Sequence, residues 1–111
     1  MKTVFIFNNE RLGIGDEELG EELIGSFLRK VWANDEKPDV MIFYHAGVKL
    51  LIKESPVLDA MEALSKAGVD LIVCGTCAGY YKVRDDIQFG RISDMTEIMR
   101  LIMAADKVVT P

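Results

Sequence analysis

The sequence predicts an α/β fold, namely a three-layer α/β/α sandwich around a mainly parallel sheet of about five strands. Three observations support this prediction. Short apolar runs recur along the chain, segments with helical periodicity separate them, and no hairpin turn such as Asn-Gly joins neighbouring runs. Strands separated by helices pair in parallel, because a parallel neighbour is reached through a crossover connection. The length of 111 residues fits one domain, residues 1–111.

Five runs have the composition of strands. Residues 4–7, 39–44 and 69–74 are rich in β-branched and aromatic side chains, as is typical of strands that are buried on both faces of a sheet. Residues 107–110 predict a fourth strand. The run at residues 90–93 is short and follows a polar segment, and it predicts a fifth strand.

The first helix is predicted over residues 16–32, where apolar residues recur three or four apart. Asp16 is positioned to cap its first turn, and the acidic residues that follow lie near the positive end of the helix dipole. The Gly13-Ile14-Gly15 segment before it is interpreted as a turn. A dinucleotide loop would follow its strand directly and carry a third glycine at a fixed spacing.

Two further helices have recognisable starts. The Ser-Pro pair at residues 55–56 is typical of a capping residue and the first helical residue, and the apolar period continues to Gly68, a common helix terminator. Asp94, with Glu97 three residues later, resembles a capping box and predicts a last helix to about residue 105. Three methionines four apart on that helix, at 95, 99 and 103, predict core packing, with soft-metal binding as the alternative.

The composition excludes several classes of protein. Half of the residues are apolar, which predicts a folded chain. The 18 acidic and 13 basic residues give a net charge of −5, so we expect neither a nucleic acid nor a membrane surface as a partner. No apolar run approaches the roughly 20 residues of a membrane span, and the first apolar run is too short for an export signal. We therefore expect a cytoplasmic protein, whose two cysteines are thiols, a metal site or a redox pair.

Residues with chemical potential follow the first three predicted strands. Ligands of open parallel sheets bind at the carboxyl ends of the strands, because loops and helix amino termini converge there. We therefore expect the functional site at this edge of the sheet. The candidate residues are Asn8, Asn9, His45, Gly47, Cys74, Gly75, Thr76 and Cys77.

The Cys74-Gly75-Thr76-Cys77 segment places two sulfurs on one helical turn, where the helix dipole and free amides favour thiolates. Cys74 is then a nucleophile and Cys77 a resolving thiol; the alternatives are an inert buried Cys74 and a packing role for Cys77. His45 is either a base or anion ligand, or a hydrogen-bonded loop residue. A structural zinc site usually has two Cys-x-x-Cys pairs or a His pair, and this chain offers four ligands only by adding His45 and a carboxylate, so we expect no metal and no cofactor.

Four segments, taken in order and spacing, resemble the DsrE-like family, most closely the YedF-type domain associated with selenium metabolism. They are residues 13–20, 43–50, 55–58 and 73–77. The resemblance covers essentially the whole chain. His45-Ala46 stands where YedF-type sequences have Asn-Gly, and Lys82 replaces a glycine that commonly closes the short helix after the cysteine.

The resemblance implies sulfur or selenium relay by a homo-oligomer. In the wider family a persulfide-carrying cysteine follows a central strand, and Cys74 matches that position. A donor persulfide would pass its outer sulfur to Cys74, an acceptor thiolate would remove it, and Cys77 could resolve the persulfide as an internal disulfide. Asn9, His45 and Gly75 would line the pocket. The partners would be donor and acceptor proteins or small thiols.

Two other functions remain open. One is a non-enzymatic module that binds a small ligand or regulates a partner, and the other is a dithiol redox protein. Whether the chain is an enzyme, a sulfurtransferase, also stays open. Self-association is expected to bury apolar residues against a second copy. The candidates for that surface are Trp32, Tyr80, Tyr81, Met99 and Met103.

Overall fold

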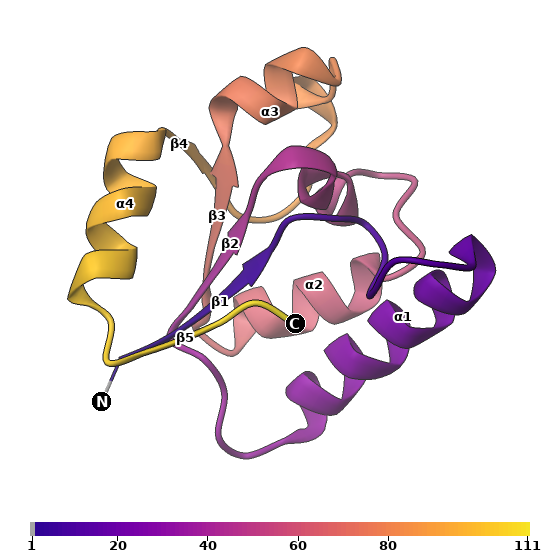
Figure 1. Cartoon of the computed structure of the whole chain (residues 1–111), viewed down its shortest axis with the longest axis horizontal. Coiled ribbons are helices and arrows are strands. Elements are labelled where there is room, and N and C mark those ends of the chain that lie inside the picture. Colours follow the sequence, from indigo (N-terminus) through magenta and orange to yellow (C-terminus); the bar gives the residue numbers. More distant parts are fainter. Residues whose placement is uncertain (1) are drawn as a thin grey trace.

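Five parallel strands, in the order β4-β3-β2-β1-β5, form the centre of the computed structural model, which describes residues 2–111 (Figure 1). Every strand pair within these residues is parallel, so the predicted fold class is confirmed. The predicted strands agree with the observed ones to within one residue at each end. The strands are β1 (Thr3–Phe7), β2 (Val40–Phe43), β3 (Asp70–Cys74), β4 (Arg91–Ser93) and β5 (Lys107–Val109).

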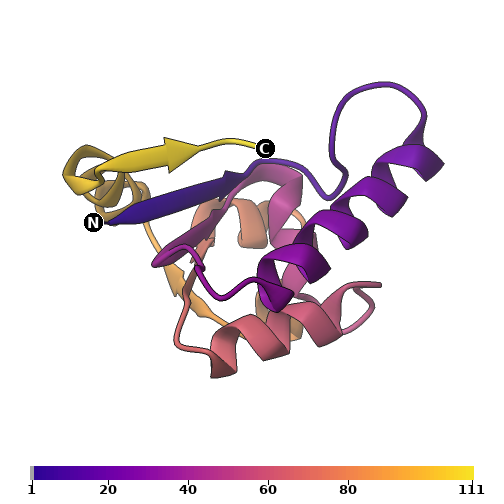
Figure 2. The ribbon, with the colours of Figure 1, turned by 90° about the horizontal axis from the view of Figure 1, so that it is seen from below.

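Helices cover both faces of the sheet. Alternate strand residues enter two separate hydrophobic clusters, because successive side chains of a strand point to opposite faces. Phe43 packs on the face of α1 (Glu17–Ala33) and α2 (Leu58–Lys66), and its neighbour Ile42 packs on the face of α4 (Met95–Ala104). Figures 1 and 2 show these three layers. Within residues 2–111, no helix combines the length and the apolar composition that a bilayer crossing requires.

Two of the predicted caps are present. The Asp16 carboxylate accepts the N–H of Leu19 at 2.9 Å, and the Asp94 carboxylate accepts the N–H of Glu97 at 2.9 Å. The second half of the predicted capping box is missing. The Glu97 carboxylate instead pairs with Arg91 on β4 at 2.7 Å, and this ion pair holds its pKa down at about 2. The helix start therefore also anchors the edge strand.

The predicted start of α2 is wrong by two residues. The helix begins at Leu58, and Pro56 lies in the turn before it. The Ser55 hydroxyl accepts the N–H of Val57 at 3.2 Å, so it stabilises that turn and not the first helical turn. The predicted end is confirmed, because Gly68 has a φ of +94°, a conformation that glycine adopts without strain.

The prediction that the methionines of α4 fill the core is wrong. Met95, Met99 and Met103 are 55%, 50% and 78% exposed. Ile98 and Ile102, on the neighbouring stripe of the helix, pack against the sheet instead. Because two adjacent stripes of α4 are apolar, helical periodicity alone does not identify which one faces inward. The methionines form an apolar surface, which we call the α4 face.

Candidate functional site

The carboxyl ends of β1, β2 and β3 lie next to one another, as the sequence predicts. Phe7 is in register with Phe43, and Phe43 with Val73, so the segments that follow these residues emerge at one edge. This edge brings together the predicted site residues from all three strands. Asn9 and His45 line one surface hollow, and His45, Thr76 and Cys77 line a second one.

Gly47 and Gly75 line neither hollow. Both are buried, and the backbone of a neighbouring segment lies close to the space that a side chain would occupy. A Cβ on Gly47, in the 3-10 helix η1 (His45–Leu51), would lie 2.1 Å from the carbonyl oxygen of Phe7. A Cβ on Gly75 would lie 3.1 Å from the carbonyl oxygen of Ser93. These two glycines therefore allow η1 and the start of α3 to pack closely against neighbouring strands, next to the site.

The two cysteines differ in accessibility. Cys74 caps the short helix α3 (Gly75–Tyr80) and is 2% exposed, in the cluster that also contains Ile72 and Ile98. Cys77 lies one turn further along and is half-buried. Both are free thiols. Among residues 2–111, no three His, Cys, Asp or Glu side chains are grouped so that they could hold a metal ion.

A backbone amide is directed at the accessible sulfur. The N–H of His45 donates to Sγ of Cys77 at 3.0 Å. His45 has a φ of +53°, a left-handed conformation that non-glycine residues rarely adopt and that asparagine tolerates better than most. An asparagine at this position, as expected in YedF-type sequences, would adopt the same conformation with less strain. The strained turn directs the N–H of His45, the first residue of η1, at Cys77 of α3. Both the backbone and the ring of His45 therefore contribute to the site.

The pKa of the Cys77 thiol is raised above its ordinary value. Burial is the largest cause, the hydrogen bond from the His45 N–H acts in the opposite direction, and the neighbouring Cys74 raises the pKa further. The position near the helix start therefore does not bring the pKa of Cys77 below its ordinary value. Desolvation in the hollow outweighs the stabilisation that the amide provides.

The second hollow, which we call the thiol hollow, has a volume of about 360 Å³ and is lined by His45, Thr76, Cys77, Tyr80 and Tyr81. The Tyr81 hydroxyl lies 3.3 Å from Nδ1 of His45, a hydrogen-bond distance that orients the imidazole. The role of Tyr81 at the site was not predicted from the sequence. Its position four residues after Cys77 was the available signal, because such residues share one helix face.

Lys49 brings a positive charge next to the thiol hollow. Its ammonium lies 4.4 Å from the centre of the Tyr81 ring and 3.5 Å from a carboxylate oxygen of Glu10. Arg84 is exposed, and its Nη1 donates to the carbonyl oxygen of Gly75 at 3.0 Å. It thereby tethers the start of α3.

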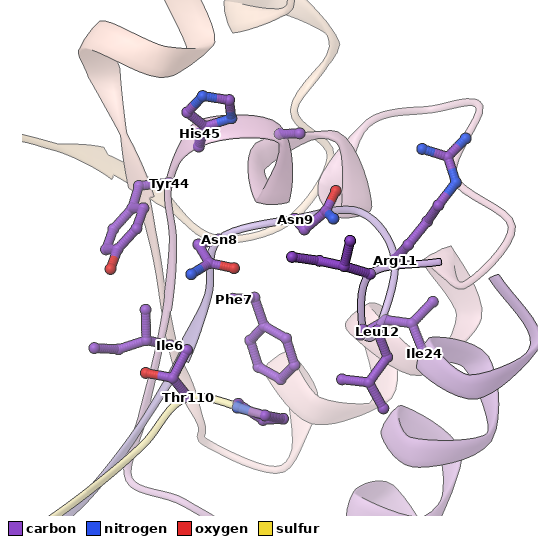
Figure 3. Close-up of a pocket in the computed structure, with 14 residues that line it drawn as sticks. Ile6, Phe7, Asn8, Asn9, Arg11, Leu12, Ile24, Tyr44, His45 and Thr110 are labelled. Carbon is purple, nitrogen blue, oxygen red and sulfur yellow. The ribbon is translucent and has the colours of Figure 1, made fainter. Parts of the chain in front are cut away.

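The first hollow, which we call the amide hollow, is larger, at about 700 Å³ (Figure 3). Figure 3 shows Asn8, Asn9 and the His45 ring around it, with the Phe7 side chain among them. The guanidinium of Arg11 extends away from Phe7 and lies within 3.6 Å of Glu10, Glu17 and Glu21 carboxylates. His45 thus lines both hollows.

Replacement of Lys82 by glycine is expected to stabilise the fold by about 0.5–1 kcal/mol. Lys82 follows α3 with a φ of +59°, where a side chain is strained and glycine is not. Thermal or urea unfolding measures the change. Lys66→Gly, at the last residue of α2, is the matched control and should destabilise by up to about 1 kcal/mol. Equal destabilisation by both changes would contradict the strain at Lys82.

Three solved structures share this fold over nearly the full length of both chains. The ychN protein from E. coli has a TM-score of 0.70 at 16% identity, with 100% of each chain covered. MTH1491 from Methanobacterium thermoautotrophicum, a protein of unknown function, has a TM-score of 0.71 at 21% identity and covers 99% of this chain and 98% of its own. BT1422 from Bacteroides thetaiotaomicron, a conserved protein of unknown function, has a TM-score of 0.70 at 12% identity, with 99% and 95% covered. At such identities the likeness shows the fold alone.

The sequence itself identifies the family. A comparison with curated protein sequences finds no match. The sequence profile of the DsrE/DsrF-like family, in contrast, matches residues 1–111, the whole chain. The chain therefore belongs to the DsrE/DsrF-like family.

Proposed function

We propose that the chain is a sulfur-relay protein that carries a sulfane sulfur on its Cys74–Cys77 dithiol, with Cys77 as the thiol that receives it. One observation carries the assignment to Cys77. Its sulfur lines the thiol hollow and accepts the N–H of His45, whereas Cys74, the carrier implied by the family resemblance, is 2% exposed. A relay thiol must be reached by the thiols of its partners.

The chemistry needs no external oxidant. The Cys77 thiolate, formed by loss of its proton to solvent, attacks the outer sulfur of a donor persulfide, and the donor leaves as a thiolate. An acceptor thiolate then attacks the outer sulfur on Cys77, gains it as a persulfide and releases the Cys77 thiolate. The N–H that His45 directs at the sulfur supports the thiolate in both steps.

Cys74 supports a second outcome. Its thiolate can attack the inner sulfur of the Cys77 persulfide, which forms a Cys74–Cys77 disulfide and releases hydrosulfide; the two thiols are oxidised and the transferred sulfur is reduced. The likeness to YedF-type domains extends the proposal to selenium as cargo. Donor and acceptor are proteins or small thiols of a reducing cytoplasm.

Mass spectrometry of the intact protein tests the proposal. The reduced protein is incubated with a persulfide donor, as wild type, Cys74→Ser and Cys77→Ser. We expect a gain of one sulfur atom in wild type and in Cys74→Ser and none in Cys77→Ser. A gain in Cys77→Ser but not in Cys74→Ser would identify Cys74 as the carrier, as the family resemblance implies. No gain in any form would leave a ligand-binding or regulatory module as the better account.

We propose further that a second copy of the chain covers the α4 face. Its exposed methionines support this, since monomers rarely leave such a row uncovered. Met99→Glu is expected to reduce the mass of the particle in light scattering by at least half, because burying a carboxylate at the interface is unfavourable. Leu19→Glu, a similarly exposed apolar residue on α1, is the matched control and should leave the mass unchanged. A wild-type particle of only 12.4 kDa at high concentration would contradict self-association.

A further inference from the structure

A third hollow, of about 450 Å³, lies at the opposite edge of the sheet from the cysteines. Thr3 and Lys107, the first residues of β1 and β5, contribute to it, as does Pro38, which precedes β2. The C-terminal turns of α1 close its other side. Figure 1 shows the loop after α1 leading back to the edge where β1 and β5 begin. Its volume lies within the range of small-molecule sites, about 300–1,000 Å³.

The floor of this hollow is apolar and aromatic. Phe5 and Phe27 line it, with ring centres 6.0 Å apart, together with Val31 and Pro38. Both phenylalanines are only partly buried, although they pack against the main core cluster. Part of the surface of both phenylalanines is therefore accessible to an apolar group in the hollow.

The rim is basic in an acidic protein. Lys30, Lys37 and Lys107 all line the hollow, with Glu36 as the one acidic residue. Among residues 2–111, no carboxylate lies within 4.0 Å of any of these three ammonium groups, whereas Lys49 and Lys66 each have such a partner. Lys37 donates to the carbonyl oxygen of Asn34 at 2.5 Å, which holds its side chain at the rim. In a chain with a net charge of −5, this is a concentration of positive charge that internal ion pairs do not neutralise.

We propose that this lysine hollow, defined by Phe5, Phe27, Lys30, Lys37 and Lys107, binds an amphipathic organic anion. The carboxylate or sulfonate of such a molecule would lie among the three ammonium groups, and its apolar body would lie on the phenylalanines. An inorganic anion would leave the apolar floor uncovered, and a neutral apolar molecule would leave the lysines without a partner. The site is distinct from the dithiol and does not depend on the proposed relay.

Fluorescence titration with 1-anilinonaphthalene-8-sulfonate, an aromatic sulfonate, tests the proposal. Saturable binding is expected for the wild type, and Lys30→Gln with Lys107→Gln should weaken it about tenfold. Lys53→Gln with Lys66→Gln removes the same two charges outside the hollow and is the matched control. If the two double variants weaken dye binding equally, the effect comes from the net charge of the protein, and the proposed binding site is contradicted.

Competition and mapping separate this site from other apolar surfaces. Octanoate should displace the dye, while 1-octanol and inorganic phosphate should not at the same concentration, because each lacks one half of the recognised chemistry. Amide chemical shifts should change at Thr3, Phe27 and Lys107. Shifts confined to the α4 face, or displacement by octanol as effective as by octanoate, would contradict the proposal.

Discussion

Replacement of Gly47 by alanine is expected to destabilise the fold by about 3 kcal/mol or more, because a Cβ there would make a closer contact than at any other glycine of residues 2–111. The new Cβ would lie 2.1 Å from the carbonyl oxygen of Phe7 and 2.9 Å from its carbonyl carbon. Both atoms belong to the backbone of a central strand, so neither can move away cheaply. Relief would require displacing η1, which carries His45 and its N–H toward Cys77.

Urea unfolding measures this effect, and Gly79→Ala is its control. Gly79 lies inside α3, and its nearest contact to an added Cβ is a side-chain carbon of Arg84 at 4.0 Å. That substitution should be neutral or stabilising by up to about 1 kcal/mol, because alanine favours helices. A Gly47→Ala protein as stable as Gly79→Ala would show that η1 does not approach β1 as described.

The reaction of Cys77 with iodoacetamide is expected to accelerate about a hundredfold between pH 6 and pH 8. The reactive species is the thiolate, and its fraction rises about tenfold per pH unit below the pKa. Burial raises the pKa of Cys77 above its usual range, so the rise should continue through neutral pH without a plateau. Peptide mapping after brief labelling follows Cys77 separately from Cys74.

Cys74→Ala provides the matched comparison for this pH profile. The neighbouring Cys74 raises the pKa of Cys77, so its removal should shift the profile toward lower pH and increase the rate at pH 7. Burial of Cys77 remains, and the profile should therefore still rise above neutral pH. A plateau below pH 7 in the wild type would mean that the helix start and the His45 amide outweigh burial.

The sheet could be predicted from the sequence because its strands are short, apolar and separated by helices. The positions of Asn9, His45 and Cys77 at one edge follow from that topology alone, since parallel strands end on the same side. The Asp16 cap could also be predicted, because the capping residue and the N–H that it accepts lie within one helical turn. Each of these predictions depended on periodicity or on neighbours in the sequence.

The accessibility of individual side chains depends on tertiary packing and was harder to predict. Cys74 is buried because its side chain lies on the same side of β3 as Ile72, two residues earlier, and Ile98 of α4 packs in the same cluster. The left-handed turn at His45 arises where η1 approaches the end of β1, and neither histidine nor alanine is a residue type that predicts such a turn. The inward stripe of α4 was likewise decided by contacts that the helix alone does not reveal.

Fragmentation of the intact, sulfur-loaded wild-type protein in the mass spectrometer tests the central claim most directly. Cleavage of the backbone between Gly75 and Thr76 separates the two cysteines, so the added sulfur is assigned to one of them. The exposure of Cys77 in the thiol hollow and its contact with the His45 amide predict the added mass on the fragment that contains Cys77. The added mass on the Cys74 fragment at the earliest time points would contradict the proposed order of the two thiols.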